Sequence, residues 1–283
     1  MGCTSSSFSA SQLPLSVGHM VHEAHASIGG SSTTNSTNAV LVVGASGSIG
    51  RHVVVESLRA GFETRALVRD PEQASLFPSS ARVVVGDPSD PEVLGVALDG
   101  VVGVVLAQGT YRDADAERVN YRPVKAVLDA LQAPARIALM TTLGVTKPTT
   151  GHDWKRRAER LVRASGLPYT IVRPGWFDYN EPDQHRLVLL QGDRRWAGSP
   201  EDGVISRAQI AQVLVASLTS DAADHKTFEL VAEKGDAPAD LDPLFAALAP
   251  DTALDGPYDR DNLSLADEAA AVISDLDALR GRF

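Results

Sequence analysis

Three glycines in a stretch of seven residues, Gly44-Ala45-Ser46-Gly47-Ser48-Ile49-Gly50, follow the apolar run Ala39–Val43. An apolar pattern typical of a helix starts directly after the third glycine. Glycines here permit a tight turn and let the backbone approach a phosphate closely, while the helix N-terminus supplies free N–H donors and a positive dipole end. The stretch therefore predicts a loop that binds the pyrophosphate of a dinucleotide. The predicted contacts are Gly44, Ser46, Gly47, Ser48, Ile49 and Gly50.

The next apolar run, Glu63–Val68, ends at Arg69-Asp70. At this point NAD sites usually present a carboxylate to the ribose hydroxyls, whereas NADP sites present an arginine to the 2′-phosphate. Arg69 favours NADP because a guanidinium can hold a phosphate through two hydrogen bonds, and Arg51 could assist it. The neighbouring Asp70 keeps NAD open as an alternative.

A third run, Arg82–Val85, leads into Gly86-Asp87. In a dinucleotide site this is where the adenine should lie, so that the Asp87 side chain or the backbone beside it would bond the base. The alternative is that Asp87 and Pro88 form only a turn.

Short apolar runs alternate with helix-like segments from residue 39 onward, at the spacing of successive βα units in a parallel sheet. The alternation predicts a single Rossmann-like α/β domain over residues 39–283, with a doubly wound parallel sheet. Beyond Pro174 the repeat gives way to loops, and we expect residues 174–283 to form a small portion that faces the substrate. The expected strands are Ala39–Val43, Glu63–Val68, Arg82–Val85, Val101–Leu106, Arg136–Met140 and Tyr169–Val172, and the expected helices are Gly50–Ala60, Pro91–Ala97, Glu117–Leu131, Trp154–Ala164 and Ser264–Leu279.

The composition narrows the classes of partner. A chain of 283 residues with 43% hydrophobic residues can bury a sizeable core, and its net charge of -10 opposes binding to nucleic acid. The single cysteine, Cys3, permits neither an internal disulfide nor a thiolate metal cluster. No run approaches the roughly 20 apolar residues of a membrane-spanning helix. We therefore expect a cytoplasmic protein with a small-molecule substrate, no metal site and no transmembrane segment.

Residues 1–38 are rich in serine and threonine, contain no lysine or arginine, and show no helix or strand periodicity. This composition predicts a disordered leader. The start Met1-Gly2-Cys3 fits N-myristoylation beside a cysteine that could be palmitoylated, so a lipid anchor through Gly2 and Cys3 is one alternative. A plastid transit peptide is another.

From Ala39 to about Leu230 the chain resembles the atypical short-chain dehydrogenase/reductases, especially their NmrA-like branch with its GxxGxxG loop. The glycine loop, Val68-Arg69-Asp70-Pro71, Gly86-Asp87 and Thr141-Thr142-Leu143-Gly144 carry the resemblance. Its most specific part is Ser165-Gly166-Leu167-Pro168-Tyr169-Thr170-Ile171-Val172-Arg173-Pro174-Gly175. In that family the Pro-Gly pair lies beside the nicotinamide. The resemblance therefore implies that Pro174 and Gly175 contact the cofactor and, with Trp176, form walls of the reaction pocket.

The catalytic set of that family is a serine or threonine after the fifth strand, with a tyrosine and a lysine four residues apart. The resemblance implies that the hydroxyl of Thr142, or of Thr141, polarises a substrate carbonyl. It also implies that Lys155 holds the nicotinamide ribose and supports a proton donor.

Gly151 stands four residues before Lys155, where the family has its tyrosine. His152, Tyr111 or a bound water would then have to donate the proton. Three functions follow from the resemblance. The first is NADPH-linked reduction of a carbonyl-type small molecule, and the second is a non-catalytic regulatory protein that senses NADP, which Gly151 favours. The third is an isomerase or epimerase in which hydride leaves and returns within one turnover.

Overall fold

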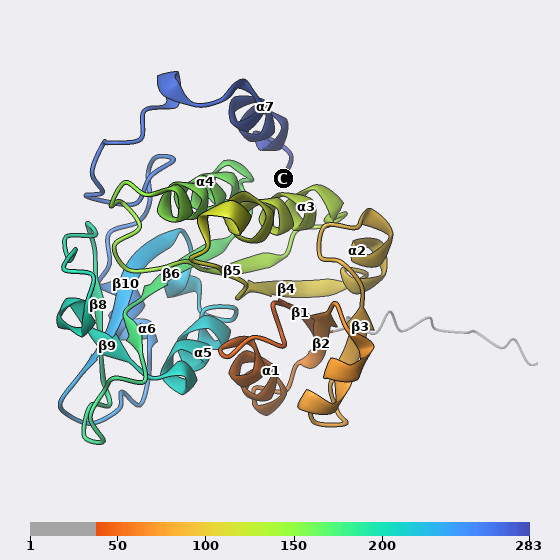
Figure 1. Cartoon of the computed structure of the whole chain (residues 1–283). Helices are drawn as coiled ribbons and strands as arrows, with labels where there is room; N and C mark the ends of the chain where they lie inside the picture. The colour runs from red at the N-terminus through yellow and green to blue at the C-terminus, as the bar shows by residue number, and fades with distance from the viewer. Residues whose placement is uncertain (1–37) are drawn as a thin grey trace, which may run out of the picture. The chain divides into compact units, whose positions relative to one another are not determined.

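A computed structural model describes residues 38–283 (Figure 1). The predicted disordered leader and the possible acylation at Gly2 and Cys3 lie outside these residues. The described chain forms a mostly parallel sheet in the order β3-β2-β1-β4-β5-β6-β10-β9-β7, with β8 also paired to β10. The strands are β1 (Ala39–Val43), β2 (Glu63–Val68), β3 (Arg82–Val85), β4 (Val101–Leu106), β5 (Arg136–Met140), β6 (Tyr169–Pro174), β7 (Trp176–Phe177), β8 (Arg186–Leu190), β9 (Val204–Ile205) and β10 (Lys226–Glu233).

Helices cover both faces of this sheet (Figure 1). On one face lie α2 (Pro91–Ala97), α3 (Arg122–Ala130), α4 (Thr150–Ala164) and α7 (Ala270–Leu279). On the other lie α1 (Gly50–Arg59), α5 (Arg207–Ala216) and α6 (Asp242–Ala246). The sequence expectation of a doubly wound α/β fold is confirmed.

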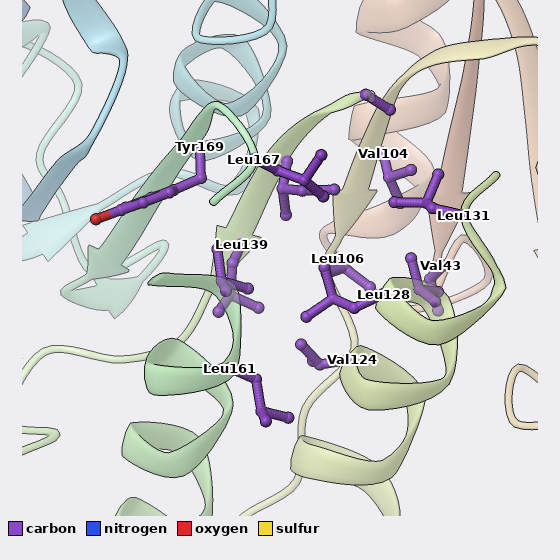
Figure 2. Packing of buried hydrophobic residues seen from close by; sticks show 14 of the residues in the cluster. Val43, Val104, Leu106, Val124, Leu128, Leu131, Leu139, Leu161, Leu167 and Tyr169 are labelled. Atoms are coloured by element: carbon purple, nitrogen blue, oxygen red, sulfur yellow. The ribbon is translucent and has the colours of Figure 1, made fainter. Parts of the chain in front are cut away.

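Strand β1 lies at the centre of the sheet between β2 and β4 and is buried along its whole length. Leu41 and Val43 point into the core beneath α3 and α4, whereas Val40 and Val42 pack toward α1 and α5. Figure 2 shows the first of these clusters, with Leu128 of α3 and Leu161 of α4 facing the sheet. Burial on both sides explains why β1 reads as an unbroken apolar run rather than an alternating one.

The structure places more sheet after Pro174 than the sequence predicted. The additional parallel strand β10 pairs with β6, and the antiparallel strand β8 pairs with its other edge. The polar residues Thr227 and Glu229 interrupt the apolar pattern of β10, although both are buried. In the interior, Thr227 contacts Arg163 and Glu229 contacts Arg173. The local sequence pattern does not predict these contacts, so it does not predict the strand.

Two expected helices are shorter than predicted. The expected helix at Glu117–Leu131 opens with a π-helical turn, Glu117–Tyr121, before α3. The expected C-terminal helix begins as a separate 3-10 turn, Leu265–Asp267, so that α7 starts only at Ala270. Within residues 38–283, no helix has both the length and the apolar content needed to cross a membrane.

Arginines on α4 attach the C-terminal segment 251–268 to the outside of that helix. Arg156 and Arg160 donate to the two carboxylate oxygens of Asp255, with Nε–Oδ1 at 2.9 Å and Nη2–Oδ2 at 2.8 Å. Arg163, one turn further on, donates from Nε to Asp251 Oδ2 at 2.8 Å. All three guanidinium groups are buried. Three buried arginines therefore hold this segment along α4.

Candidate active site

Two cavities lie at the carboxyl ends of the parallel strands, where α/β folds bind their ligands. We call the first, of about 320 Å³, the glycine-loop cleft because Gly44, Gly47 and Ser48 line it. We call the second, of about 500 Å³, the aromatic chamber because Trp176 and Trp196 line it. Two residues, Tyr111 and Phe177, line both cavities. The two spaces therefore adjoin.

The three glycines of the loop do different structural work. A Cβ on Gly44 would lie 2.6 Å from Gln108 N, and a Cβ on Gly50 would lie 2.1 Å from Gly44 O, so both positions need close backbone approach. Gly47 is exposed, and a Cβ there would meet only Gly44 O, at 3.1 Å. Gly47 is therefore the glycine that leaves the cleft open rather than the one that holds the turn together.

Helix α1 begins behind this loop with Ile49 at its N-cap. No side chain among the described residues caps this end, and its first turn contains no acidic residue. The backbone N–H of Arg51 donates to Gly47 O at 3.1 Å, but the positive dipole end of the helix faces the cleft without a side-chain cap and can attract an anion. Ser46, Gly47, Ser48 and Ile49 all line the cleft in front of them.

Arg69 lines the far part of the glycine-loop cleft, at the end of β2. In the described chain, no carboxylate lies within ion-pair distance of its guanidinium. The neighbouring Asp70 turns away: its Oδ1 accepts from Glu72 N at 2.9 Å and caps the following 3-10 turn. Arg51, on α1, is exposed and is not among the cleft residues.

Asp87 also lines this cleft, and its Oδ1 accepts from Ser89 N at 2.7 Å. The turn that the sequence offered as an alternative is therefore present. Asp87 thus lies beside the cleft at the end of β3, and its contact with an adenine stays a prediction.

Tyr111, Thr142 and Lys155 come together where the two cavities adjoin. The Tyr111 Oη atom lies 3.4 Å from Thr142 Oγ1, and Lys155 Nζ lies 4.0 Å from the centre of the Tyr111 ring. Tyr111 is 31 residues before Thr142 in the chain, on the loop that follows β4. A tyrosine, a threonine and a lysine thus meet in space although Gly151 occupies the position of the family tyrosine.

Lys155 is buried in the second turn of α4, and its side chain lines the cleft. Burial lowers the pKa of this ammonium from 10.5 to about 8, against the opposing attraction of Glu159. A buried cation needs an anionic or hydroxyl partner, because desolvation penalises the charged form. The ribose hydroxyls of a dinucleotide are partners of this kind.

Asn120 positions the loop that carries Tyr111, a role that the sequence analysis missed. Its Oδ1 accepts from Thr110 N at 2.9 Å, and its Nδ2 donates to Thr110 O at 3.2 Å and to Gly151 O at 3.5 Å. Asn120 is buried within the π-helical turn before α3. The only signal in the sequence is a polar residue inside a helix-like segment, which by itself indicates nothing about Tyr111.

Thr141 and Thr142 have different surroundings. Thr141 lines the glycine-loop cleft, but its Oγ1 donates to the buried Glu159 Oε1 at 2.7 Å, so its hydroxyl hydrogen is already engaged. Thr142 lines the aromatic chamber and donates to the carbonyl of Leu143 at 3.2 Å. Of the two hydroxyls that the sequence offered, that of Thr142 is the one beside Tyr111.

His152 lines the aromatic chamber near the start of α4. Its Nδ1 lies 3.1 Å from Lys147 O, and because a carbonyl oxygen only accepts, Nδ1 carries a proton. Burial lowers the pKa of His152 below its usual 6.5. In the neutral ring with this tautomer, Nε2 accepts a hydrogen bond rather than donating one.

Pro174 and Gly175 lead from β6 into the wall of the aromatic chamber. A Cβ on Gly175 would lie 2.5 Å from Gly203 O, so this position requires glycine for close packing of the backbone. Trp176 then donates from its backbone N to Gly203 O at 2.9 Å. The close approach directs the chain across the carboxyl end of the sheet.

A sequence profile described as NAD(P)H-binding matches residues 44–221 of the chain. The chain belongs to this NAD(P)H-binding family. The matched residues include the glycine loop, Arg69 and the triplet of Tyr111, Thr142 and Lys155. Membership agrees with the resemblance to atypical short-chain dehydrogenase/reductases and with the Rossmann-like sheet.

The chain shares sequence with individual curated proteins at a low level. The chain is 28% identical over 237 residues to "Protein TIC 62, chloroplastic" of Pisum sativum, with 69% of this chain and 43% of the pea protein covered. It is 25% identical over 261 residues to "Sanguinarine reductase" of Eschscholzia californica, with 73% and 94% covered. The chain thus spans less than half the length of the pea relative.

Among solved structures, a putative NAD-dependent epimerase/dehydratase from Bacillus halodurans aligns with a TM-score of 0.62 and 22% identity. The alignment covers 74% of this chain and 99% of that one. At this identity the likeness supports the fold alone.

Proposed function

We propose that the chain is an NADPH-dependent reductase of a carbonyl-type small molecule in which Tyr111 donates the proton. The observation that carries the proposal is the meeting of Tyr111, Thr142 and Lys155 between the glycine-loop cleft and the aromatic chamber. When bound, NADPH would supply a hydride to the carbonyl carbon.

The described residues fit such a cofactor. Gly47 leaves open space in front of the uncapped N-terminus of α1, which suits a pyrophosphate. Arg69 has no carboxylate partner in the described chain, and Asp70 is occupied as a helix cap, so a 2′-phosphate is the better partner for this end of the cleft. The arrangement of Arg69 and Asp70 supports NADPH over NADH, whereas the pyrophosphate site suits either cofactor.

Each of the three residues would have a separate task at the carbonyl. Thr142 would turn its hydroxyl hydrogen from Leu143 O to the carbonyl oxygen of the substrate, where negative charge develops. Tyr111 would then deliver its proton to the same oxygen. Lys155 would hold the ribose and keep a positive charge beside the tyrosine as the proton leaves.

The position of Tyr111 also favours an enzyme over the two alternatives. Gly151 favours the alternative of a non-catalytic regulatory protein, because it stands where the family has its tyrosine. A Cβ on Gly151 would face Asp113 Oδ1 at 3.6 Å, on the loop that carries Tyr111. Tyr111 therefore approaches the same neighbourhood from another segment. An epimerase of this type must let the keto intermediate turn its opposite face to the nicotinamide before the hydride returns, and no observation on residues 38–283 points to such a rearrangement.

The test is the Tyr111→Phe variant, which keeps the ring over Lys155 and removes only the hydroxyl. We expect carbonyl reduction to fall by about 10²–10⁴-fold while NADPH affinity changes little, as for the loss of a general acid. The matched control is Tyr258→Phe, because Tyr258 is as exposed as Tyr111 but lines neither cavity. Aldehydes, ketones and quinones with NADPH provide the assay. Tight NADPH binding without turnover of any panel member by the wild type would favour the regulatory alternative.

A further inference from the structure

The lining of the aromatic chamber is richer in aromatic side chains than the chain as a whole. Two of the three tryptophans and two of the five tyrosines of the chain line it, together with Phe177. Trp176 and Tyr179 stand edge to face with ring centres 6.1 Å apart, and both remain exposed. Exposed flat rings around a cavity are suited to contact with another flat, apolar group.

The charges of the chamber are unbalanced toward the positive. Its lining contains Lys147, Arg195 and Arg207 but only one carboxylate, Asp202. The two oxygens of Asp202 already accept the backbone N–H groups of Ala197 and Gly198, at 2.8 and 2.6 Å. A local excess of positive charge stands out in a chain whose net charge is -10.

The three cations differ in their partners. Arg207 is paired with Asp178. Lys147 donates only to a backbone carbonyl, that of Trp196 at 3.3 Å, and Arg195 donates from Nη1 to the carbonyl of Asp202 at 3.1 Å. Within residues 38–283, no carboxylate lies within ion-pair distance of either side chain. Their charges remain available to a ligand in the chamber.

We infer that the aromatic chamber selects a substrate that is both flat and anionic: an aromatic or conjugated carbonyl compound that carries a carboxylate or a phosphate. The rings of Trp176 and Tyr179 would cover its flat part, while Lys147 and Arg195 would bind its anionic group. This inference rests on the proposed function for the reactive carbonyl. The binding of an unreactive ligand is independent of turnover, so the two can fail separately.

The experiment compares naphthalene-2-carboxylate with naphthalene-2-carboxamide, which have the same ring system and differ in charge. Each is titrated into the full-length protein saturated with NADP⁺, by calorimetry. We expect the carboxylate to bind about tenfold more tightly or better, because bonds to charged groups are the stronger ones. The advantage should shrink as salt is raised, since the chamber is open to solvent.

Lys147→Met and Arg195→Met remove one charge each and keep most of the side-chain length. Each variant should reduce the ratio of the two affinities several-fold and leave carboxamide binding nearly unchanged. Arg194→Met is the matched control, because Arg194 is the exposed neighbour of Arg195 and does not line the chamber. It should keep the wild-type ratio. Should the Arg195 variant fail to fold, Lys147→Met alone carries the test.

Equal affinities for the carboxylate and the carboxamide would overturn the inference, as would a wild-type ratio that survives in both charge variants. Turnover adds a second arm, with 4-carboxybenzaldehyde and methyl 4-formylbenzoate as substrates. If the neutral ester is reduced as efficiently as the acid, the reductase stands and the anionic class is wrong. If neither is reduced while the naphthoate still binds selectively, the class of ligand stands and the proposed reaction is wrong.

Discussion

Arg173 donates two hydrogen bonds to Glu159, from Nε to Oε1 at 3.0 Å and from Nη2 to Oε2 at 2.6 Å. Both side chains are almost fully buried. The pair joins β6, which ends at Pro174, to α4, which carries Lys155. Thr141 donates to the same carboxylate at 2.7 Å. One buried anion therefore connects the three segments that position the candidate active site.

Glu159→Gln should destabilise the protein by about 1.5–3 kcal/mol, because it removes one of the two carboxylates that each of Arg173 and Arg163 contacts, while Asp259 and Asp251 remain. Urea denaturation at pH 7 measures the change. Glu181→Gln, on an exposed loop, is the control and should have little effect. A loss below about 1 kcal/mol would contradict the importance of the pair.

The same carboxylate predicts a component of acid unfolding. Burial alone would raise the pKa of Glu159, but Arg173 and its hydrogen bonds lower that pKa from 4.5 to about 2. A carboxyl with a lowered pKa stabilises the folded state above pH 4.5, and this contribution is lost as the pH falls toward 2. The stability of Glu159→Gln should therefore fall less steeply over this range than that of the wild type.

The sequence predicted the fold well because each βα unit is local. The strand β1, the glycine loop and the start of α1 are consecutive, and their signals are apolar runs and glycines that need no knowledge of distant partners. The added strand β10 was missed for the opposite reason. Its buried Thr227 and Glu229 are tolerated only because arginines from α4 and β6 reach them across the fold.

The candidate site likewise contains residues with local sequence signals and residues whose position depends on distant contacts. The glycine loop, Arg69 and Lys155 follow patterns of fixed spacing, whereas Tyr111 was only one of three proton donors that the sequence left open. Tyr111 reaches Thr142 because Asn120 holds its loop through two bonds to Thr110. That arrangement depends on how a loop and a π-helical turn pack, which spacing along the chain does not encode.

Gly47→Val should abolish nucleotide binding without unfolding the protein. A side chain here meets only Gly44 O within the fold, so its bulk would enter the space proposed for the pyrophosphate. Titration with NADPH by calorimetry, together with thermal unfolding of the unliganded protein, separates the two effects. Gly50→Ala provides the contrast, since its Cβ would overlap backbone and should lower stability. Unchanged NADPH affinity in Gly47→Val would contradict the placement of the cofactor.

Arg69→Ala should weaken NADPH binding by about 1.5–3 kcal/mol, the usual contribution of hydrogen bonds to a charged group. NADH affinity should change little, because NADH lacks the 2′-phosphate. Arg51→Ala is the control, since Arg51 is exposed and outside the cleft lining. The preference for NADPH is wrong if both cofactors lose affinity equally, or if the wild type binds NADH more tightly.

Lys155 predicts how activity depends on pH. Burial lowers the pKa of its ammonium to about 8, so the charge beside Tyr111 disappears as the pH rises through this value. If the charge supports proton delivery and holds the ribose, kcat/KM should fall by about tenfold per pH unit above pH 8. The measurement is the pH profile of NADPH oxidation with any active carbonyl substrate. It runs from about pH 6 to about pH 10, so that it brackets the pKa of the lysine.

Loss of stability through deprotonation of Lys155 does not explain this fall in kcat/KM. Because the folded pKa of Lys155 lies below 10.5, the folded state binds fewer protons than the unfolded chain between about pH 8 and 10.5, and its contribution to stability improves as the pH rises. Lys155→Arg keeps a cation at every pH tested and should move the decline upward, at a lower maximum rate. Lys155→Met should be nearly inactive throughout. A wild-type profile that stays flat to pH 10, or one that Lys155→Arg leaves unmoved, would assign the decline to another group and remove Lys155 from the proposed reaction.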